Sequence, residues 1–525
     1  MQAFMTLKMR EIYPVAAEKG WRSLAKRLGA LKKSPFGDTF EKVFMLSAAH
    51  AVSGLLMLAT FVLLANKLGP RLYGEFTFVD SVLFIAILCA SLGTEYVGNR
   101  EVARSSDSRE LVNGVLLLRS VASLAAFAVI VAWTLLFIDS PTLRPLMLIS
   151  AGVLLSVPGI AGWYFLAKHR IRIVAFVTLI REAAFFIPVL LILDLIEDPE
   201  RKLLFAGVFY FLSRLIFALV FLVRLLAENG FCLKVKRATY SFLFKDSLAL
   251  LYASIVSSVT IGMQIYMLKL LGEEFALGVY GALFKQIFYI QLLSLSFIMV
   301  FFPLLSRAWV EDRARYSRLA SALSELTLVV VLPIAMTGVL YPDYILSLFF
   351  TPEYAQGGLA LQLLCLSLIP MSYVRVLTTG VLISMDMTSK MYSLVNIAFV
   401  GSLFSGLVIF AFQGADAGAA ASRLLAECLF AAVSYRVVAS KVRVITAGLL
   451  WCVIPGAVSM VLVSFIIPKG HELLGMIACY ASFFAVYLIG LFYGRLDEIK
   501  DALSASGRGG SEKASEKILI EREET

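Results

Sequence analysis

The sequence predicts an all-α integral membrane protein whose chain crosses the bilayer about fourteen times. Three observations support this prediction. Of the 525 residues, 60% are hydrophobic and only 16% are charged, whereas soluble globular proteins carry about 25% charged residues. The apolar residues form runs of about 20, the length that a helix needs to cross the hydrocarbon core. These runs are continuous and do not alternate with polar residues, which excludes a transmembrane β-barrel.

The predicted spans fall into three groups along the chain. An expected N-terminal lobe, residues 43–227, has six spans near 43–66, 76–98, 112–138, 145–167, 171–194 and 202–227. A cytoplasmic linker, 228–245, leads to an expected C-terminal lobe, 246–438, with six spans near 246–271, 278–303, 319–341, 359–385, 391–412 and 415–438. Residues 439–494 hold two further spans, near 444–466 and 473–494.

Both ends of the chain are polar. In the basic segment 1–42, Trp21, Leu24 and Leu28 recur at helical spacing, which predicts an amphipathic helix on the inner leaflet. A disordered basic tail is the alternative for this segment. Residues 495–525 are rich in Ser, Gly, Glu and Lys, which is typical of a disordered tail, here expected in the cytoplasm.

The loops between the spans alternate in charge. One set is basic, for example around Arg100 and Arg170, and the alternate set is acidic, as in 194–200. The positive-inside rule places the basic loops in the cytoplasm, and an even number of spans returns the chain to the same side. We therefore expect a multi-pass protein of the cell membrane with both termini cytoplasmic.

Two short patterns each occur twice, in the same order. They are Leu68-Gly69 with Tyr73-Gly74 against Leu271-Gly272 with Tyr280-Gly281, and Ser213-Arg214-Leu215 against Ser422-Arg423-Leu424. Each copy falls at the corresponding span of a six-span half. The patterns predict two lobes in a parallel pseudo-twofold repeat, with a substrate path between them. Chance recurrence of glycine-rich loops and an arginine is the alternative.

Ionisable side chains inside the predicted spans are the candidate functional residues. Each costs roughly 2.5–3.5 kcal/mol at the bilayer centre, so it must face protein or water. An excess of cations favours a cavity for an anion, because guanidinium binds phosphate bidentately. Buried ion pairs and snorkelling side chains are the structural alternative. The cationic candidates for substrate binding are Arg119, Arg181, Arg214, Lys285, Arg375 and Arg423, and the acidic partner or coupling candidates are Glu182, Glu325 and Glu427.

Arg423 and Glu427 are four residues apart, so they share one face of a helix and are placed to pair. No pattern indicates catalysis: a P-loop, a nucleophile elbow and a zinc motif are all absent from the sequence, and the predicted loops are too short for an ATPase domain. The short basic clusters are typical of membrane topology rather than nucleic-acid binding. We expect neither an enzyme nor a cofactor, and neither a metal nor a nucleic-acid partner.

Several loop and span sequences together resemble a known family. They are LANKLGPRLYGEF and LGTEYVGNREVAR within 64–104, FPLLSRAWVEDRARY at 302–316, LPIAMTGVLYPDYILSLFFTPEYAQGG at 332–358 and GADAGAAASRLLAE at 414–427. Over roughly residues 43–440 the chain is similar to the polysaccharide-biosynthesis (Wzx-type) flippases of the multidrug/oligosaccharidyl-lipid/polysaccharide (MOP) exporter superfamily. The resemblance implies a two-lobe, V-shaped fold of the MATE and lipid II flippase kind, with alternating access and a cation-lined cavity.

The family implies a flippase that moves a polyprenyl-pyrophosphate-linked oligosaccharide, a polysaccharide repeat unit, from the inner to the outer leaflet. Its partners would be this lipid-linked substrate and membrane lipids, and a polysaccharide polymerase or glycosyltransferase complex is left open. A cation-coupled, MATE-like exporter of small amphipathic molecules is the alternative function, and a non-transporting scaffold for glycan assembly is another. Family members often carry Asp before the second Leu-Gly turn, where this chain has Gln264-Ile265-Tyr266-Met267, so no role of that acid is carried over.

Overall fold

All regular structure that the computed structural model describes is helical. The described residues are 35–105, 108–230, 235–291, 293–442, 444, 453–467 and 470–494. Twelve helical segments among them are long and apolar enough to cross a membrane, and the all-α membrane fold is confirmed. The predicted amphipathic helix around Trp21 and the predicted tail 495–525 lie outside the described residues.

The N-terminal lobe extends from α3 to α9. Its elements are α3 (Pro35–Ser91), α4 (Thr94–Arg104), α5 (Arg109–Phe137), α6 (Leu143–Ala151), η1 (Gly152–Gly159), α7 (Gly162–Ala167), α8 (Ile171–Leu191), η2 (Leu193–Leu195) and α9 (Pro199–Asn229). The two ends of α9 show how individual residues determine where a helix begins and ends. Asp198 accepts the backbone N–H of Glu200 and Pro199 occupies the first turn, while Gly230 stops the helix with φ 68°.

The C-terminal lobe extends from α10 to α17, and two more helices follow. The elements are α10 (Arg237–Leu270), α11 (Glu274–Gln291), α12 (Leu293–Glu311), α13 (Arg313–Leu340), α14 (Pro342–Phe349), η3 (Pro352–Gly357), α15 (Gly358–Arg375), the π-helical η4 (Val376–Leu382), α16 (Thr388–Ser405), η5 (Gly406–Ala411), α17 (Ala415–Ala439), α18 (Ile454–Ile466) and α19 (Glu472–Gly494). Asp312 caps α13 by accepting the N–H groups of Ala314 and Arg315 at 2.8 and 3.1 Å. These backbone hydrogen bonds, that from Arg315 first, lower the pKa of the Asp312 carboxyl.

The first predicted span, near 43–66, and most of the second, near 76–98, are the two arms of α3, and the second span ends in α4. Gly69 has a non-helical φ of 70° and ψ of 167°, and Pro70 begins the second arm. One glycine in this conformation redirects the chain without a loop. With the two arms counted separately and the 13-residue α18 added, the twelve segments correspond to the fourteen predicted spans.

The second arm of α3 crosses α11 in direct backbone contact. Gly69 and Gly272, the glycines of the repeated Leu-Gly pattern, both have positive φ, 70° and 74°. A Cβ at Gly278 would lie 1.7 Å from the carbonyl oxygen of Pro70, and a Cβ at Gly74 would lie 2.6 Å from the backbone of α11. Such a close crossing of membrane helices requires small residues. We call this end of the molecule, where the lobes touch, the Gly69 end.

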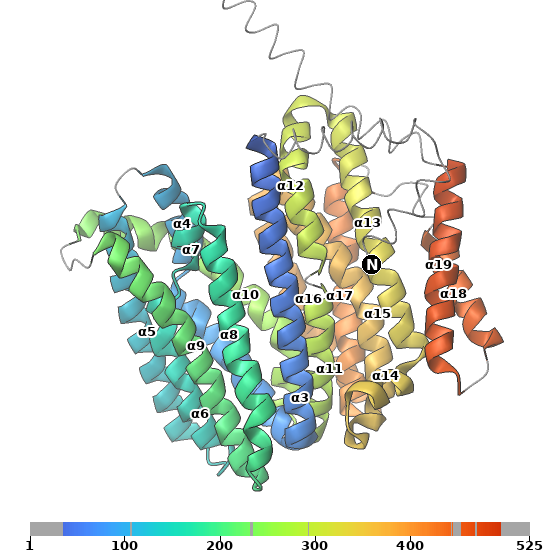
Figure 1. Cartoon of the computed structure of the whole chain (residues 1–525), viewed down its shortest axis with the longest axis horizontal. Coiled ribbons are helices and arrows are strands. Elements are labelled where there is room, and N and C mark those ends of the chain that lie inside the picture. Colours follow the sequence, from blue (N-terminus) through green and yellow to red (C-terminus); the bar gives the residue numbers. More distant parts are fainter. Residues whose placement is uncertain are drawn as a thin grey trace, which may run out of the picture.

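Helix α10 contacts both lobes along its length (Figure 1). Near its start, Asp246 Oδ2 lies 3.0 Å from Nη2 of Arg100 in α4. Near its end, Gln264 Nε2 donates to Ser422 Oγ of α17 at 3.2 Å. The helix therefore begins against the N-terminal lobe, at what we call the Arg100 end, and finishes inside the C-terminal lobe toward the Gly69 end.

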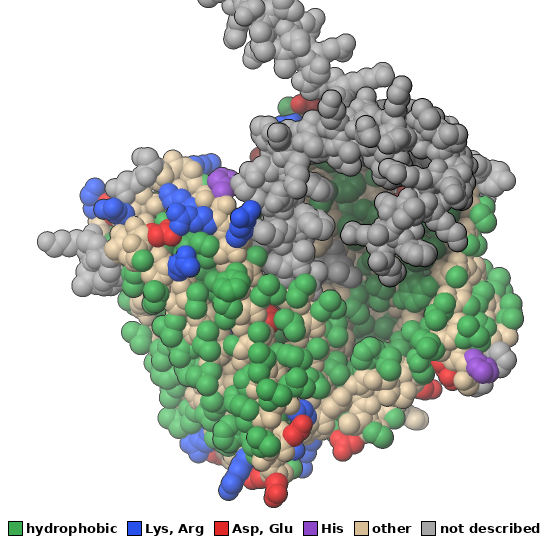
Figure 2. Space-filling model, in the orientation of Figure 1, with side chains coloured by type: hydrophobic (Ala, Val, Ile, Leu, Met, Phe, Trp, Pro, Cys, Tyr) green, Lys and Arg blue, Asp and Glu red, His purple; other side chains and the backbone are tan. Residues whose placement is uncertain are grey.

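Apolar side chains cover the middle of the surface, while charged side chains gather at its two ends (Figure 2). Leu136 and Val129 on α5, for example, expose 73% and 66% of their surface. Helices α18 and α19 lie on the outer side of the C-terminal lobe and pack against α13 (Figure 1). A broad apolar belt between charged ends is the surface of a multi-pass membrane protein.

Candidate functional site

An ion pair joins the two lobes deep in the molecule. Lys285 Nζ of α11 donates to Asp80 Oδ2 of α3 at 2.8 Å, and the side chains expose 11% and 22% of their surface. Lys285 was a predicted cationic candidate, whereas Asp80 was not selected from the sequence. A usable signal existed: Asp80 follows Gly69 by eleven residues and Lys285 follows Gly272 by thirteen, so the repeat places opposite charges at similar depth.

Aromatic rings form a wall around this ion pair. Phe61 and Phe76 of α3, Phe185 of α8, Tyr210 of α9 and Tyr289 of α11 contact one another with ring centroids between 5.8 and 6.5 Å apart. The ammonium of Lys285 lies 3.7 Å from the centroid of Phe61. A cation at a ring face gains about 0.5–2 kcal/mol, so the wall stabilises positive charge here.

Arg214 of α9 is the second cation at this wall. Its Cζ lies 4.1 Å from the ring centroid of Tyr210 and 5.7 Å from that of Phe185. Its Nη1 donates to Ser213 Oγ at 3.2 Å, and no carboxylate in the described part of the chain forms an ion pair with it. Asp80 and Glu182 are near enough to attract it electrostatically. Arg214 therefore keeps donors available for an anion.

Arg181 and Glu182 complete the group, which we call the inter-lobe cluster: Asp80, Arg181, Glu182, Arg214 and Lys285. The two neighbours on α8 form an ion pair, and Glu182 is buried while Arg181 exposes 29% of its side chain. The cluster holds three cations and two carboxylates, so its formal net charge is positive. Because Asp80 and Arg181 stay partly exposed, protein does not fill all the space beside it.

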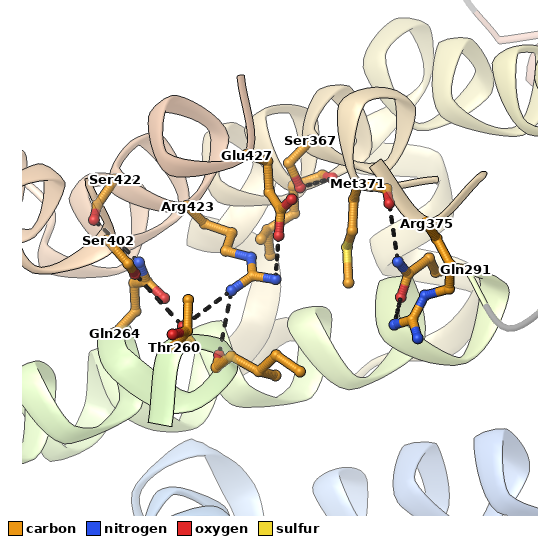
Figure 3. A network of polar contacts seen from close by, with 12 residues as sticks. Thr260, Gln264, Gln291, Ser367, Met371, Arg375, Ser402, Ser422, Arg423 and Glu427 are labelled. Atoms are coloured by element: carbon orange, nitrogen blue, oxygen red, sulfur yellow. Dashed lines mark hydrogen bonds and ion pairs between the residues drawn. The ribbon is translucent and has the colours of Figure 1, made fainter. Parts of the chain in front are cut away.

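Arg423, the repeat counterpart of Arg214, lies in a separate network inside the C-terminal lobe (Figure 3). It forms the expected ion pair with Glu427, and its Nη1 donates to the carbonyl oxygens of Thr260 and Ile261 at 3.3 and 3.5 Å. Only 2% of Arg423 is exposed. In this conformation the guanidinium ties α17 to α10 and has little surface left for a ligand.

Arg375 lies at the edge of the same network (Figure 3). Its Nη2 donates to Gln291 Oε1 at 3.1 Å, and Gln291 Nε2 donates to the carbonyl oxygen of Met371 at 3.1 Å. The π-helical segment η4 begins at the next residue, Val376, and π-helical turns are frequent at functional sites. Arg375 is only partly buried, so it remains a candidate for contact with a ligand.

Arg119 and Glu325, two further predicted candidates, lie outside the inter-lobe cluster. Arg119 is 1% exposed, and it donates to Thr94 Oγ1 and to the carbonyl oxygen of Ile160, both at 2.8 Å. Its Cζ lies 5.7 Å from the ring centroid of Trp163, so it binds parts of the N-terminal lobe to one another. Glu325 is buried in α13, which packs against α12, α15 and α18.

The described residues contain no group of three or more His, Cys, Asp or Glu side chains arranged for a metal ion. The arrangement that they do contain is a net cationic cluster at the boundary between two lobes. In it, Lys285 is paired with Asp80, while Arg214 has no carboxylate partner among the described residues.

Comparisons with known proteins agree with this architecture. The family model described as "Polysaccharide biosynthesis protein" matches residues 39–309, more than half of the chain. No curated protein matches the sequence. Among solved structures, the lipid II flippase MurJ in an inward closed conformation superposes with a TM-score of 0.64 at 14% identity, covering 86% of this chain and 99% of that one.

Two multidrug transporters show the same fold. An inward-facing multidrug resistance MATE family transporter of the MOP superfamily gives a TM-score of 0.56 at 13% identity, covering 76% of this chain and 98% of that one. The MATE multidrug transporter DinF-BH gives 0.57 at 12% identity, covering 77% and 97%. The structural similarities identify the fold, and the match to the family model identifies the family to which the chain belongs. The chain therefore belongs to the polysaccharide biosynthesis protein family and has the two-lobe fold of the MOP superfamily.

Proposed function

We propose that this protein moves a polyprenyl-pyrophosphate-linked oligosaccharide from the inner to the outer leaflet of the cell membrane by alternating access. The observation that carries the proposal is Arg214, a partly buried guanidinium between the lobes with no ion-pair partner among the described residues. A guanidinium binds phosphoryl oxygens through a planar fork. The net positive charge of the inter-lobe cluster favours the same class of ligand, and the lipid tail would stay in the bilayer.

The proposed orientation places the Arg100 end in the cytoplasm and the Gly69 end outside, with both termini cytoplasmic. Basic residues around Arg100 and Arg170 and acidic residues from Asp194 onward support it through the positive-inside rule. Single cysteines test it: Lys236→Cys should react with an impermeant thiol reagent from the cytoplasmic side only, and Glu353→Cys from the outside only. Reaction of both from one side would refute the orientation.

Energetics permit transport without a nucleotide. Each elementary charge that crosses the membrane is worth about 2.3 kcal/mol per 100 mV. An anionic headgroup that moves outward is driven by an inside-negative potential. A polymerase or glycosyltransferase complex belongs among the proposed partners, because the oligosaccharide has to be assembled on one leaflet and used on the other.

Reconstitution tests the function directly. Proteoliposomes that contain the polyprenyl-diphosphate-linked oligosaccharide are mixed with an impermeant lectin, and headgroup exposure is followed over time. We expect Arg214→Gln to abolish transfer, while Arg224→Gln, an exposed arginine on the same helix, transfers like the unmodified protein. Equal transfer by Arg214→Gln at equal protein abundance would remove Arg214 from the mechanism.

The carboxylates of the inter-lobe cluster favour a second candidate, a cation-coupled exporter of small amphipathic molecules. Asp80 and Glu182 lie beside the aromatic wall, and acids with aromatic rings suit a cationic amphipathic compound. The same liposomes separate the two functions. Uptake of a cationic dye driven by a proton or sodium gradient, with no transfer of the lipid-linked oligosaccharide, would support the exporter.

A further inference from the structure

The Asp80–Lys285 pair lies directly inward of the contact that joins the lobes at the Gly69 end. Moving inward from Gly69, α3 and α11 first touch where a Cβ on Gly278 would meet Pro70, and then where a Cβ on Gly281 would lie 2.7 Å from the side chain of Thr77. Asp80 is about one turn beyond Thr77. The ion pair is therefore the innermost charged link across this crossing, and it faces the inter-lobe cluster.

The same ammonium lies next to the proposed anion site. Asp80 and Lys285 form the 2.8 Å ion pair, and Arg214 interacts electrostatically with both of them. An anion bound at Arg214 would therefore enter the field of Lys285. The 11% exposure of the Lys285 side chain and its contact with Phe61 at 3.7 Å show that it is held in place rather than free in solvent.

We propose that Lys285 is a second anion-binding group of the site, occupied by Asp80 when the site is empty, and that a bound diphosphate takes Lys285 from Asp80 and so loosens the crossing of α3 and α11. The identity of the anion rests on the proposed function. The exchange itself rests on the geometry of the pair and on the positive charge beside it.

The exchange is inexpensive for the ammonium, because one charge-assisted hydrogen bond replaces another of similar strength. It is costly for Asp80, whose carboxylate loses its partner and then faces phosphoryl oxygens of like charge. Leaving one charge of a partly buried pair uncompensated is strongly destabilising. The strain is relieved when the arm of α3 that carries Asp80 moves away from α11. Gly69, which interrupts the helix with a non-helical φ of 70°, is where this arm can pivot, because glycine tolerates a wide range of backbone angles.

Distance measurements on the whole protein in nanodiscs test the proposal. Spin labels are placed at two exposed positions of the Gly69 end, Glu200→Cys on α9 and Gln356→Cys on η3, after the six native cysteines are replaced. The ligands are a polyprenyl diphosphate, the corresponding monophosphate and the uncharged polyprenol. We expect only the diphosphate to raise the long-distance population of the otherwise unmodified protein, by about tenfold, and Arg214→Gln to abolish this response.

Variants of Asp80 and Lys285 test, without any ligand, whether their ion pair keeps α3 and α11 together. Asp80→Asn and Lys285→Gln should each raise the long-distance population without any ligand, and Asp80→Lys combined with Lys285→Asp should restore the short distance. The matched control is Arg71→Gln, which removes the ion pair of the exposed Arg71 with Glu274 between the same two helices and should leave the distances unchanged.

Unchanged distances in both single variants of the pair would overturn the proposal, even if the protein transports the lipid-linked oligosaccharide. Opening in these variants without any response to the diphosphate would also overturn it, because the exchange would then be absent. Failure of lectin exposure in the liposomes is a separate result and would refute the proposed transport instead. Membrane abundance and the thermal unfolding midpoint of each variant show whether it folds.

Discussion

The carbonyl oxygen of Pro70 occupies the place where a side chain at position 278 would begin: a Cβ added to Gly278 would lie 1.7 Å from it. The obstacle is backbone on both sides, so no side-chain rotation can relieve the clash. The two helices can keep this crossing only while residue 278 is glycine. The contact between the lobes at the Gly69 end is therefore made by the main chain, and the ion pair of Asp80 with Lys285 lies further inward along the same two helices.

Gly278→Ala should prevent closure of the Gly69 end. The added methyl group forces α3 and α11 apart, so we expect the spin labels at positions 200 and 356 to report mainly the long distance and transfer of the lipid-linked oligosaccharide to fall at least tenfold. Gly401→Ala on α16 is the control, because nothing lies within 4 Å of a Cβ there. A short distance in Gly278→Ala would mean that the crossing adapts.

Arg214→Lys should retain only part of the transport activity. Lysine keeps the charge, but it loses the planar fork that binds two phosphoryl oxygens and the flat contact with Tyr210 at 4.1 Å. We expect initial rates of lectin exposure between those of the unmodified protein and of Arg214→Gln, with an unchanged thermal unfolding midpoint. Full activity of the lysine variant would show that charge alone is sufficient.

Much of the fold follows from the sequence because lipid imposes a length on every span. Runs of about 20 apolar residues show where each span lies, and the repeated glycines locate equivalent positions in the two lobes. The joint at Gly69 was harder to foresee. Lys67 and Arg71 have the composition of a loop, yet Lys67 pairs with Asp194 at 2.9 Å and only Gly69 between them departs from helical geometry.

The site was only partly predictable, because the rotation of each helix depends on its neighbours. Arg214 and Arg423 share one triplet, but Glu427 lies one turn beyond only the second of them. Asp80 is not among the predicted candidates because it lies near the predicted start of its span, at 76, where an ionisable side chain is ambiguous. In the structure the second arm already begins at Pro70, which places Asp80 three turns inside a helix and opposite Lys285.

Arg119→Gln should destabilise the protein without a specific effect on transport. The substitution removes the charge-assisted hydrogen bonds to Thr94 Oγ1 and to the carbonyl oxygen of Ile160, and hydrogen bonds to charged groups contribute about 1.5–3 kcal/mol each. We expect a lower thermal unfolding midpoint and lower abundance, with a normal transfer rate per folded molecule. A lost rate at normal stability would return Arg119 to the substrate-binding residues.

Arg423 and Glu427 should behave in the opposite way to Arg214, since their charges compensate each other inside the C-terminal lobe. Arg423→Gln leaves Glu427 buried and unpaired, and Glu427→Gln leaves Arg423 in the same position, so each single variant should be destabilised by about 3 kcal/mol. The double variant should lose less than the sum of the two single losses, because two neutral amides can share a hydrogen bond and leave no uncompensated charge. Thermal unfolding of the four proteins forms a double-mutant cycle, and we expect a coupling energy of about 1–3 kcal/mol. Additive losses would show that the two side chains act independently, and in that case Arg423 would be free to bind substrate as Arg214 is proposed to do.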